Sequence, residues 1–102
     1  MTESRVIIPL AAIEDFSRRW KITEFSLFGS VLREDFGPGS DVDVLVSFEE
    51  DATWSLFDLV KMKAELGEIF GRDVDLVEKD SLRNPFRRHA IMRGREVIYA
   101  TG

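Results

Sequence analysis

Apolar residues recur at helical spacing in two segments of the chain and predict amphipathic helices over about residues 9–20 and 54–70. Start and stop signals, not an apolar stripe, predict a third helix over about residues 85–93, which Gly94 ends. Thr53 or Ser55 is placed to cap the second helix, which has the strongest apolar stripe, and Gly71 is placed to end it. Asn84 precedes Pro85 as a helix cap precedes a first-turn proline.

Four other apolar runs have the length and composition of β-strands. They are Ile22–Phe28, Asp41–Phe48, Asp73–Glu78 and Glu96–Ala100. A loop rich in glycine at residues 37–40 separates the first two strands, and Ser30 is placed to cap a short helix through residues 31–33. This order of elements predicts an α/β or α+β fold, with a small mixed sheet flanked by helices.

The composition is that of one compact domain. The chain has 102 residues, of which 44% are hydrophobic and 32% charged, enough for a core and a solvated surface. We therefore expect a single domain over residues 1–102. Residues 1–8 carry no clear pattern and are expected to form an extended or flexible arm.

Charge and missing residue types exclude several classes of protein. The absence of cysteine excludes disulfides, thiolate metal sites and thiol nucleophiles, and fits a reducing, cytoplasmic compartment. A net charge of −5 argues against general nucleic-acid binding. The apolar run at residues 6–13 is too short to span a bilayer and contains Pro9, so we expect neither a signal peptide nor a transmembrane helix.

Two carboxylates stand at the start of the second predicted strand. Alternate side chains of a strand face the same way, so Asp41 and Asp43 share a face and repel each other unless a divalent cation binds. Gly29 and Ser30 end the preceding strand ten residues earlier. If the strands are neighbours, these four residues form one pocket. Backbone N–H groups after Gly29 suit a phosphate, and the carboxylates suit Mg²⁺.

A third carboxylate is expected from Asp75, whose flanking residues repeat the apolar pattern around Asp43. Three carboxylates around two metal ions are typical of in-line phosphoryl or nucleotidyl transfer. Asp75 would lie closest to the attacking oxygen and could take its proton. Asp73 is the competing candidate, but its place at the strand entrance beside Arg72 is more typical of a turn residue.

Taken together, these segments resemble the minimal nucleotidyltransferases of the DNA-polymerase-β superfamily. The matching residues are Leu27–Ser30, Arg33, Ser40–Val46 and Val74–Val77. The family pattern is an apolar residue, Gly-Ser, about ten residues, Asp-x-Asp and a later third aspartate; it is specific only in combination. The resemblance covers about residues 22–100.

The resemblance implies a polymerase-β-like nucleotidyltransferase fold and a role for each matched residue. The residues implied to hold the nucleoside triphosphate are Gly29, Ser30, Arg33 and Ser40. The implied metal ligands and catalytic residues, around two Mg²⁺ ions, are Asp41, Asp43 and Asp75. Asp75 would also serve as the base. Glu34 departs from the family, which commonly has glycine after the arginine.

The acceptor is expected to be another protein, because the chain has no added helical domain of the kind that binds small or RNA acceptors in larger relatives. The resemblance implies a HEPN-family RNase toxin as the partner, with AMP transferred from ATP to its tyrosine. The protein would then act as an antitoxin. Two alternatives stay open: a binding module that neutralises a partner by contact, and transfer to a small molecule or RNA.

The remaining charged and apolar features have simpler interpretations. His89, the only histidine, is expected at the surface. The arginines of residues 83–95 are expected on a solvated helix face, although they could contact nucleotide phosphates, an acidic partner or RNA. Exposed apolar residues on the helix at 54–70 would suit contact with a different protein.

Overall fold

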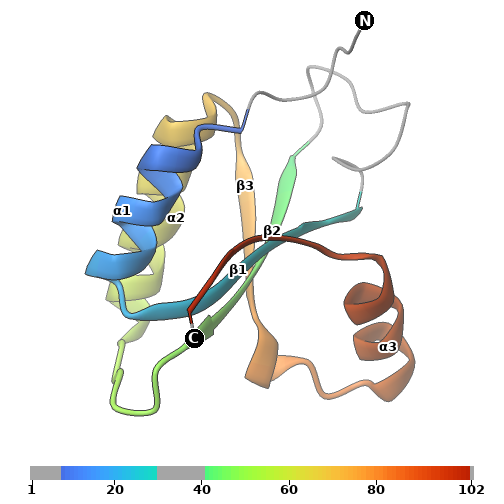
Figure 1. Ribbon diagram of the computed structural model, residues 1–102. Helices are drawn as coiled ribbons and strands as arrows, with labels where there is room; N and C mark the ends of the chain where they lie inside the picture. Colours follow the sequence, from blue (N-terminus) through green and yellow to red (C-terminus); the bar gives the residue numbers. More distant parts are fainter. Residues whose placement is uncertain (1–7, 30–40, 102) are drawn as a thin grey trace, which may run out of the picture.

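The computed structural model describes residues 8–29 and 41–101 (Figure 1). Its helices are α1 (Leu10–Arg19), α2 (Leu56–Phe70) and α3 (Pro85–Gly94), with a 3₁₀ turn η2 (Lys79–Ser81). Its strands are β1 (Ile22–Phe28), β2 (Val42–Phe48), β3 (Val74–Glu78) and β4 (Glu96–Ala100). The predicted short helix at 31–33 and most of the predicted arm lie outside the described residues.

The strands form one mixed sheet in the order β3-β2-β1-β4. Strand β1 lies at the centre and runs antiparallel to both β2 and β4. Strand β3 runs parallel to β2, because α2 crosses over the sheet between them. The predicted class of fold, a small mixed sheet with flanking helices, is confirmed.

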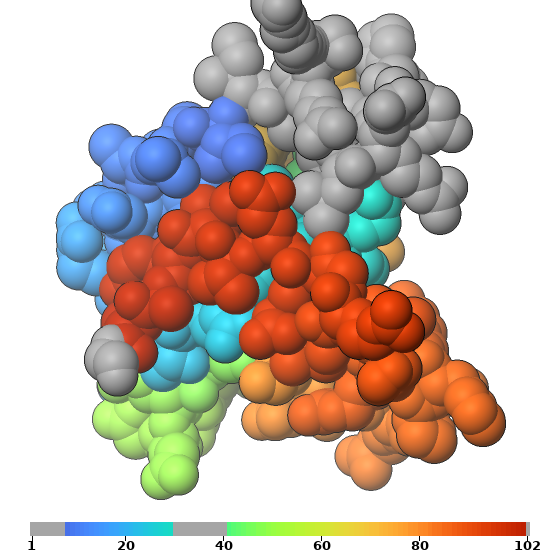
Figure 2. Space-filling view, turned by 45° about the vertical axis from the view of Figure 1, so that its right-hand side comes forward, coloured from blue at the N-terminus to red at the C-terminus, as the bar shows by residue number. Residues whose placement is uncertain are grey.

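Helices cover both faces of this sheet (Figure 1). Helices α1 and α2 pack on one face, where the main core includes Phe16, Phe25, Val44, Met62 and Leu66. Helix α3 covers part of the other face over a smaller core of Phe28, Leu45, Leu82 and Ile91. The space-filling view in Figure 2 shows α3 and β4 forming one continuous stretch of surface. Both faces of the central strands are therefore apolar.

The helix ends follow the predicted caps closely. The Ser55 hydroxyl and the Asp58 carboxylate form a capping box at the start of α2. Gly71 ends that helix in the left-handed conformation, with φ of 72°. The Asn84 side chain accepts from the backbone N–H groups of Phe86 and Arg87 at the start of α3.

Small differences from the predicted boundaries occur where the sequence pattern is ambiguous. Pro9 is the residue before α1 rather than its first member, and α2 begins after Ser55. Asp41 and Asp73 each stand one residue before their strand. The turn η2 was not predicted. Within the described residues, no helix combines the length and apolar character needed to cross a bilayer.

Candidate functional site

Two of the predicted acidic residues, Asp43 and Asp75, lie side by side where β1 ends and where β2 and β3 begin. Asp43 and Asp75 occupy paired positions in the parallel β2–β3 ladder. Phe28, the last residue of β1, pairs with Asp43 from the other side, and Gly29 follows it directly. Neighbouring strands lie about 4.8 Å apart. The fold therefore brings a glycine and two carboxylates from distant parts of the sequence to one end of the sheet.

Both carboxylates project from the face of the sheet that α3 partly covers. Val42 and Val44, which flank Asp43, are fully buried in the core beneath α1 and α2. Because side chains alternate along a strand, Asp43 points to the opposite face. Its paired residue Asp75 points the same way. Asp43 is half-buried and Asp75 is exposed, so a ligand can reach this pair from solvent.

Gly29 is required at this site for two independent reasons. Its φ is 75°, in the left-handed region that favours glycine. A side chain at this position would also collide with the Oδ2 atom of Asp43. The Asp43 carboxylate thus lies directly against the Gly29 backbone, as expected if one pocket joins the glycine and the acidic pair.

Asp41 and Asp73 lie at the entrances of their strands, and both are exposed. The backbone N–H of Val42 donates to the carbonyl oxygen of Asp73 at 2.9 Å and joins the two entrances. Asp73 itself lies between the turn at Gly71 and the first residue of β3. Asp75, not Asp73, pairs with Asp43 across the ladder.

The chemistry of the paired Asp43 and Asp75 fits a hard divalent cation, which prefers carboxylate oxygens and shares its ligand shell with phosphate. Within residues 8–29 and 41–101, no three acidic or histidine side chains are grouped as a metal site. The roles predicted for the three aspartates stay predictions. Ser30, Arg33 and Ser40, predicted to hold the triphosphate, lie outside the described residues.

Helix α3 forms a wall of the site that sequence reasoning missed. A cavity of about 230 Å³ lies between this helix and the end of β1. Its lining residues are Phe28, Gly29, Ala90, Ile91 and Gly94. The available signal was the four-residue spacing of Ala90 and Gly94, two small residues on one side of a helix. From the sequence, this helix was interpreted through its arginines and its single histidine, not through these small residues.

The arginines near α3 divide into structural and exposed groups. Arg95 pairs with Glu24 of β1 at 2.8 Å and donates to the Met92 carbonyl at 2.7 Å, which ties the end of α3 to the sheet. Arg88 donates to the Lys79 carbonyl at 3.0 Å. The other three arginines, Arg83, Arg87 and Arg93, are exposed. His89 is also exposed, as predicted.

The Glu24–Arg95 pair also has an electrostatic consequence. Partial burial opposes ionisation of Glu24, but the Arg95 guanidinium outweighs it and holds the pKa of this carboxyl below its usual value. Ser26 adds a hydrogen bond to the same carboxylate at 3.2 Å. The charged form of Glu24 is therefore the one that keeps α3 in place over the site.

Comparison with known proteins agrees with this geometry. The sequence profile of the nucleotidyltransferase domain matches residues 11–98, most of the chain, and the protein belongs to this family. It is 35% identical to the protein adenylyltransferase MntA of Thermococcus cleftensis over 86 residues, which are 84% of this chain and 82% of that protein. The predicted resemblance is thus confirmed.

Solved structures give the same fold. One, assigned provisionally as a minimal nucleotidyltransferase, is 32% identical, has a TM-score of 0.71, and is matched over 85% of this chain and 86% of its own. A toxin–antitoxin structure with AMP-PNP is 21% identical with a TM-score of 0.74, over 92% of this chain and 75% of that one. The second likeness shows the fold alone.

Proposed function

We propose that this protein transfers AMP from ATP to a tyrosine hydroxyl of a HEPN-family RNase toxin and thereby acts as its antitoxin in the cytoplasm. The observation that carries the proposal is the placement of Asp43 and Asp75 in register, with the Asp43 carboxylate against Gly29. This placement supports the proposal because paired carboxylates suit a metal ion that also binds phosphate, and the chain belongs to the nucleotidyltransferase family.

Each residue has a distinct part in the proposed reaction. Asp41, Asp43 and Asp75 would hold Mg²⁺, which when bound neutralises charge on the triphosphate. Asp75, exposed at the start of β3, takes the proton of the attacking hydroxyl. The bond from the tyrosine oxygen to the α-phosphorus forms as the bond from that phosphorus to the β-phosphate bridge breaks, and pyrophosphate leaves.

The nucleotide would enter along the glycine end of the pocket. The exposed backbone of Gly29 can approach a phosphate closely because no side chain intervenes. Ser30, Arg33 and Ser40 are proposed to complete the phosphate site. The choice of ATP rests on relatives: MntA of Thermococcus cleftensis is a protein adenylyltransferase, and a toxin–antitoxin structure of the same fold holds AMP-PNP.

A protein acceptor is supported by another structural relative. The complex of a tri-AMPylated Shewanella oneidensis HEPN toxin with an MNT antitoxin contains a chain 21% identical to this one, with a TM-score of 0.65. It is matched over 90% of this chain and 70% of that one. By analogy, we expect a HEPN-family protein to be the acceptor here.

The direct test uses ATP labelled with ³²P at the α-phosphate, Mg²⁺ and a HEPN-family protein from the same genome. Label should appear on that protein with the native enzyme and be absent with Asp41→Ala/Asp43→Ala. Label confined to RNA or to a small molecule would reject the proposed acceptor. Absence of any label, together with undiminished neutralisation by the double variant, would favour a binding module.

A further inference from the structure

The outer edge of β3 has backbone groups that no described residue pairs with. Among the described residues, β3 is the last strand of the sheet and pairs with β2 alone. The Asp73 carbonyl accepts a hydrogen bond from Val42 of β2, so the backbone groups of Asp73 and of every second residue after it face β2. The backbone N–H groups of the residues between them, which include Leu76 and Glu78, therefore point outward. The Glu78 carbonyl accepts a hydrogen bond from the Ser81 hydroxyl at 2.7 Å. The N–H groups of Leu76 and Glu78 have no acceptor among the described residues.

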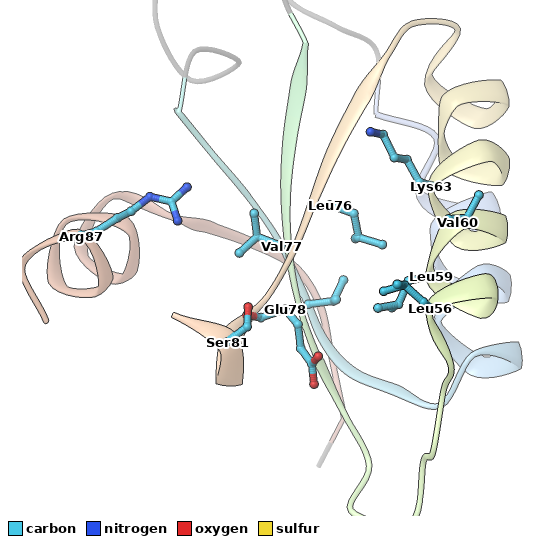
Figure 3. Close-up of a pocket in the computed structure, with 10 residues that line it drawn as sticks. Leu56, Leu59, Val60, Lys63, Leu76, Val77, Glu78, Ser81 and Arg87 are labelled. Atoms are coloured by element: carbon cyan, nitrogen blue, oxygen red, sulfur yellow. The ribbon is translucent and has the colours of Figure 1, made fainter. Parts of the chain in front are cut away.

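A groove of about 420 Å³ lies along this edge, between α2 and α3 (Figure 3). On the α2 side it is lined by Leu56 and Val60, whose exposed fractions are 76% and 63%. Apolar residues beside an open strand edge invite pairing with another chain, and natural proteins usually cover or blunt such an edge. The groove therefore has both elements of a strand-addition site: backbone donors and side-chain pockets.

The charges in the groove indicate what kind of segment would fit. Lys63 on α2 and Arg87 on α3 lie on opposite sides of β3 (Figure 3). Both side chains are exposed, and neither forms an ion pair within the described part of the chain. Glu78 is the one acidic residue among the described residues that line the groove, so these side chains carry a net positive charge on a chain of net charge −5. An occupant with carboxylates would complement it.

We propose that this groove binds an extended segment of the protein partner by strand addition to β3. Its side chains would point alternately toward Leu56 and Val60 on the α2 side, where they are apolar, and toward Arg87 on the α3 side, where they are carboxylates; Lys63 would bind an acidic residue at the end of the apolar row. The alternation of side chains along a strand suits this division. Asp75 stands one residue before Leu76 on the same strand, so the docked segment would bring its protein next to the candidate site. The inference rests on the proposed function only in that the acceptor is a protein.

A peptide selection tests the docking site without nucleotide. A phage-displayed library of random nonapeptides is selected on the native protein, and enriched peptides are measured against Glu78→Pro and Glu78→Ala. Glu78 has φ of −87°, close to the value proline requires, so proline removes the outward N–H with little strain. Alanine removes the same carboxylate but keeps the donor, which makes it the matched control.

We expect enriched peptides to alternate apolar and acidic residues and to bind Glu78→Pro on the order of tenfold more weakly than Glu78→Ala. Equal melting temperatures of the two variants would exclude misfolding as the cause. A second variant, Lys63→Glu/Arg87→Glu, should weaken the acidic peptides several-fold and select basic ones instead. It keeps every backbone donor.

Three results would overturn the docking site: no enriched peptides, equal binding to both Glu78 variants, or indifference to the charge reversal. A native protein that forms dimers broken by Glu78→Pro would assign the edge to a second copy instead. Label transfer is measured separately. Transfer without peptide binding rejects only the docking site, whereas peptide binding without transfer rejects only the proposed function.

Discussion

The close approach of the Asp43 carboxylate to Gly29 makes Gly29→Ala the sharpest probe of the site. The substitution has two separable effects. An alanine in the left-handed conformation costs about 1–2 kcal/mol of folding free energy, and its Cβ also collides with Oδ2 of Asp43. The carboxylate, half-buried at the sheet end, must then rotate away from its present position.

Gly71 provides a matched control for the backbone effect alone. Its φ is 72°, nearly the same as the 75° of Gly29, but nothing lies within 4 Å of a Cβ built there. Gly71→Ala should therefore lose about 1–2 kcal/mol and Gly29→Ala at least as much, and each kcal/mol lowers the melting temperature by about 4–8 °C in a domain of this size.

Only Gly29→Ala should also lose activity. Misplacing a reacting group by about 1 Å costs on the order of a hundredfold in rate. Initial rates of ³²P transfer, measured at a temperature where both variants are folded, should fall by about that factor for Gly29→Ala relative to Gly71→Ala. Equal rates for the two variants would show that the Asp43 carboxylate does not need its position against Gly29.

Three further predictions follow from the same geometry. Asp41→Ala/Asp43→Ala should fold, as circular dichroism would show, but lose transfer by on the order of a thousandfold; a small loss would mean that other groups hold the metal. Mg-ATP at a hundredfold excess over its dissociation constant should stabilise the native protein by about 2.7 kcal/mol, and an unchanged melting temperature would contradict the triphosphate pocket. The Arg95 contact lowers the pKa of Glu24. The contact therefore stabilises the fold fully above pH 4.5, the ordinary pKa of the carboxyl, and this stabilisation is lost as the pH falls through the lowered pKa. Urea unfolding of Glu24→Gln should be less dependent on pH in that acidic range than that of the native protein, and parallel curves would argue against it.

Local patterns in the sequence were sufficient for most of the elements. The capping box at Ser55, the left-handed Gly71 and the Asn84 cap are short-range interactions, and each can be identified from a few consecutive residues. Strand alternation also predicted that Asp41 and Asp43 share a face. The family pattern then connected Gly29 with the acidic residues before any pairing of strands was known.

Long-range pairing could not be obtained in the same way. The register that places Asp43 opposite Asp75 depends on how β2 and β3 meet, which no local pattern specifies. Leu56 belongs to the apolar stripe that predicted α2, yet 76% of it is exposed, because the start of α2 lies beside the open edge of β3. Ala90 and Gly94 carry no polar group that marks a site in the sequence; they line the cavity beside β1 because their small size leaves it open.

The mass of the proposed HEPN-family partner, recovered from cells that also express this protein, shows whether AMP is transferred to it. With the native protein, we expect a partner heavier by one or more AMP groups, each mapped to tyrosine by fragmentation. With Asp41→Ala/Asp43→Ala, the partner should keep its unmodified mass and its toxicity. If the native protein protects cells while the partner stays unmodified, AMP transfer is not the mechanism, because neutralisation would then require contact alone.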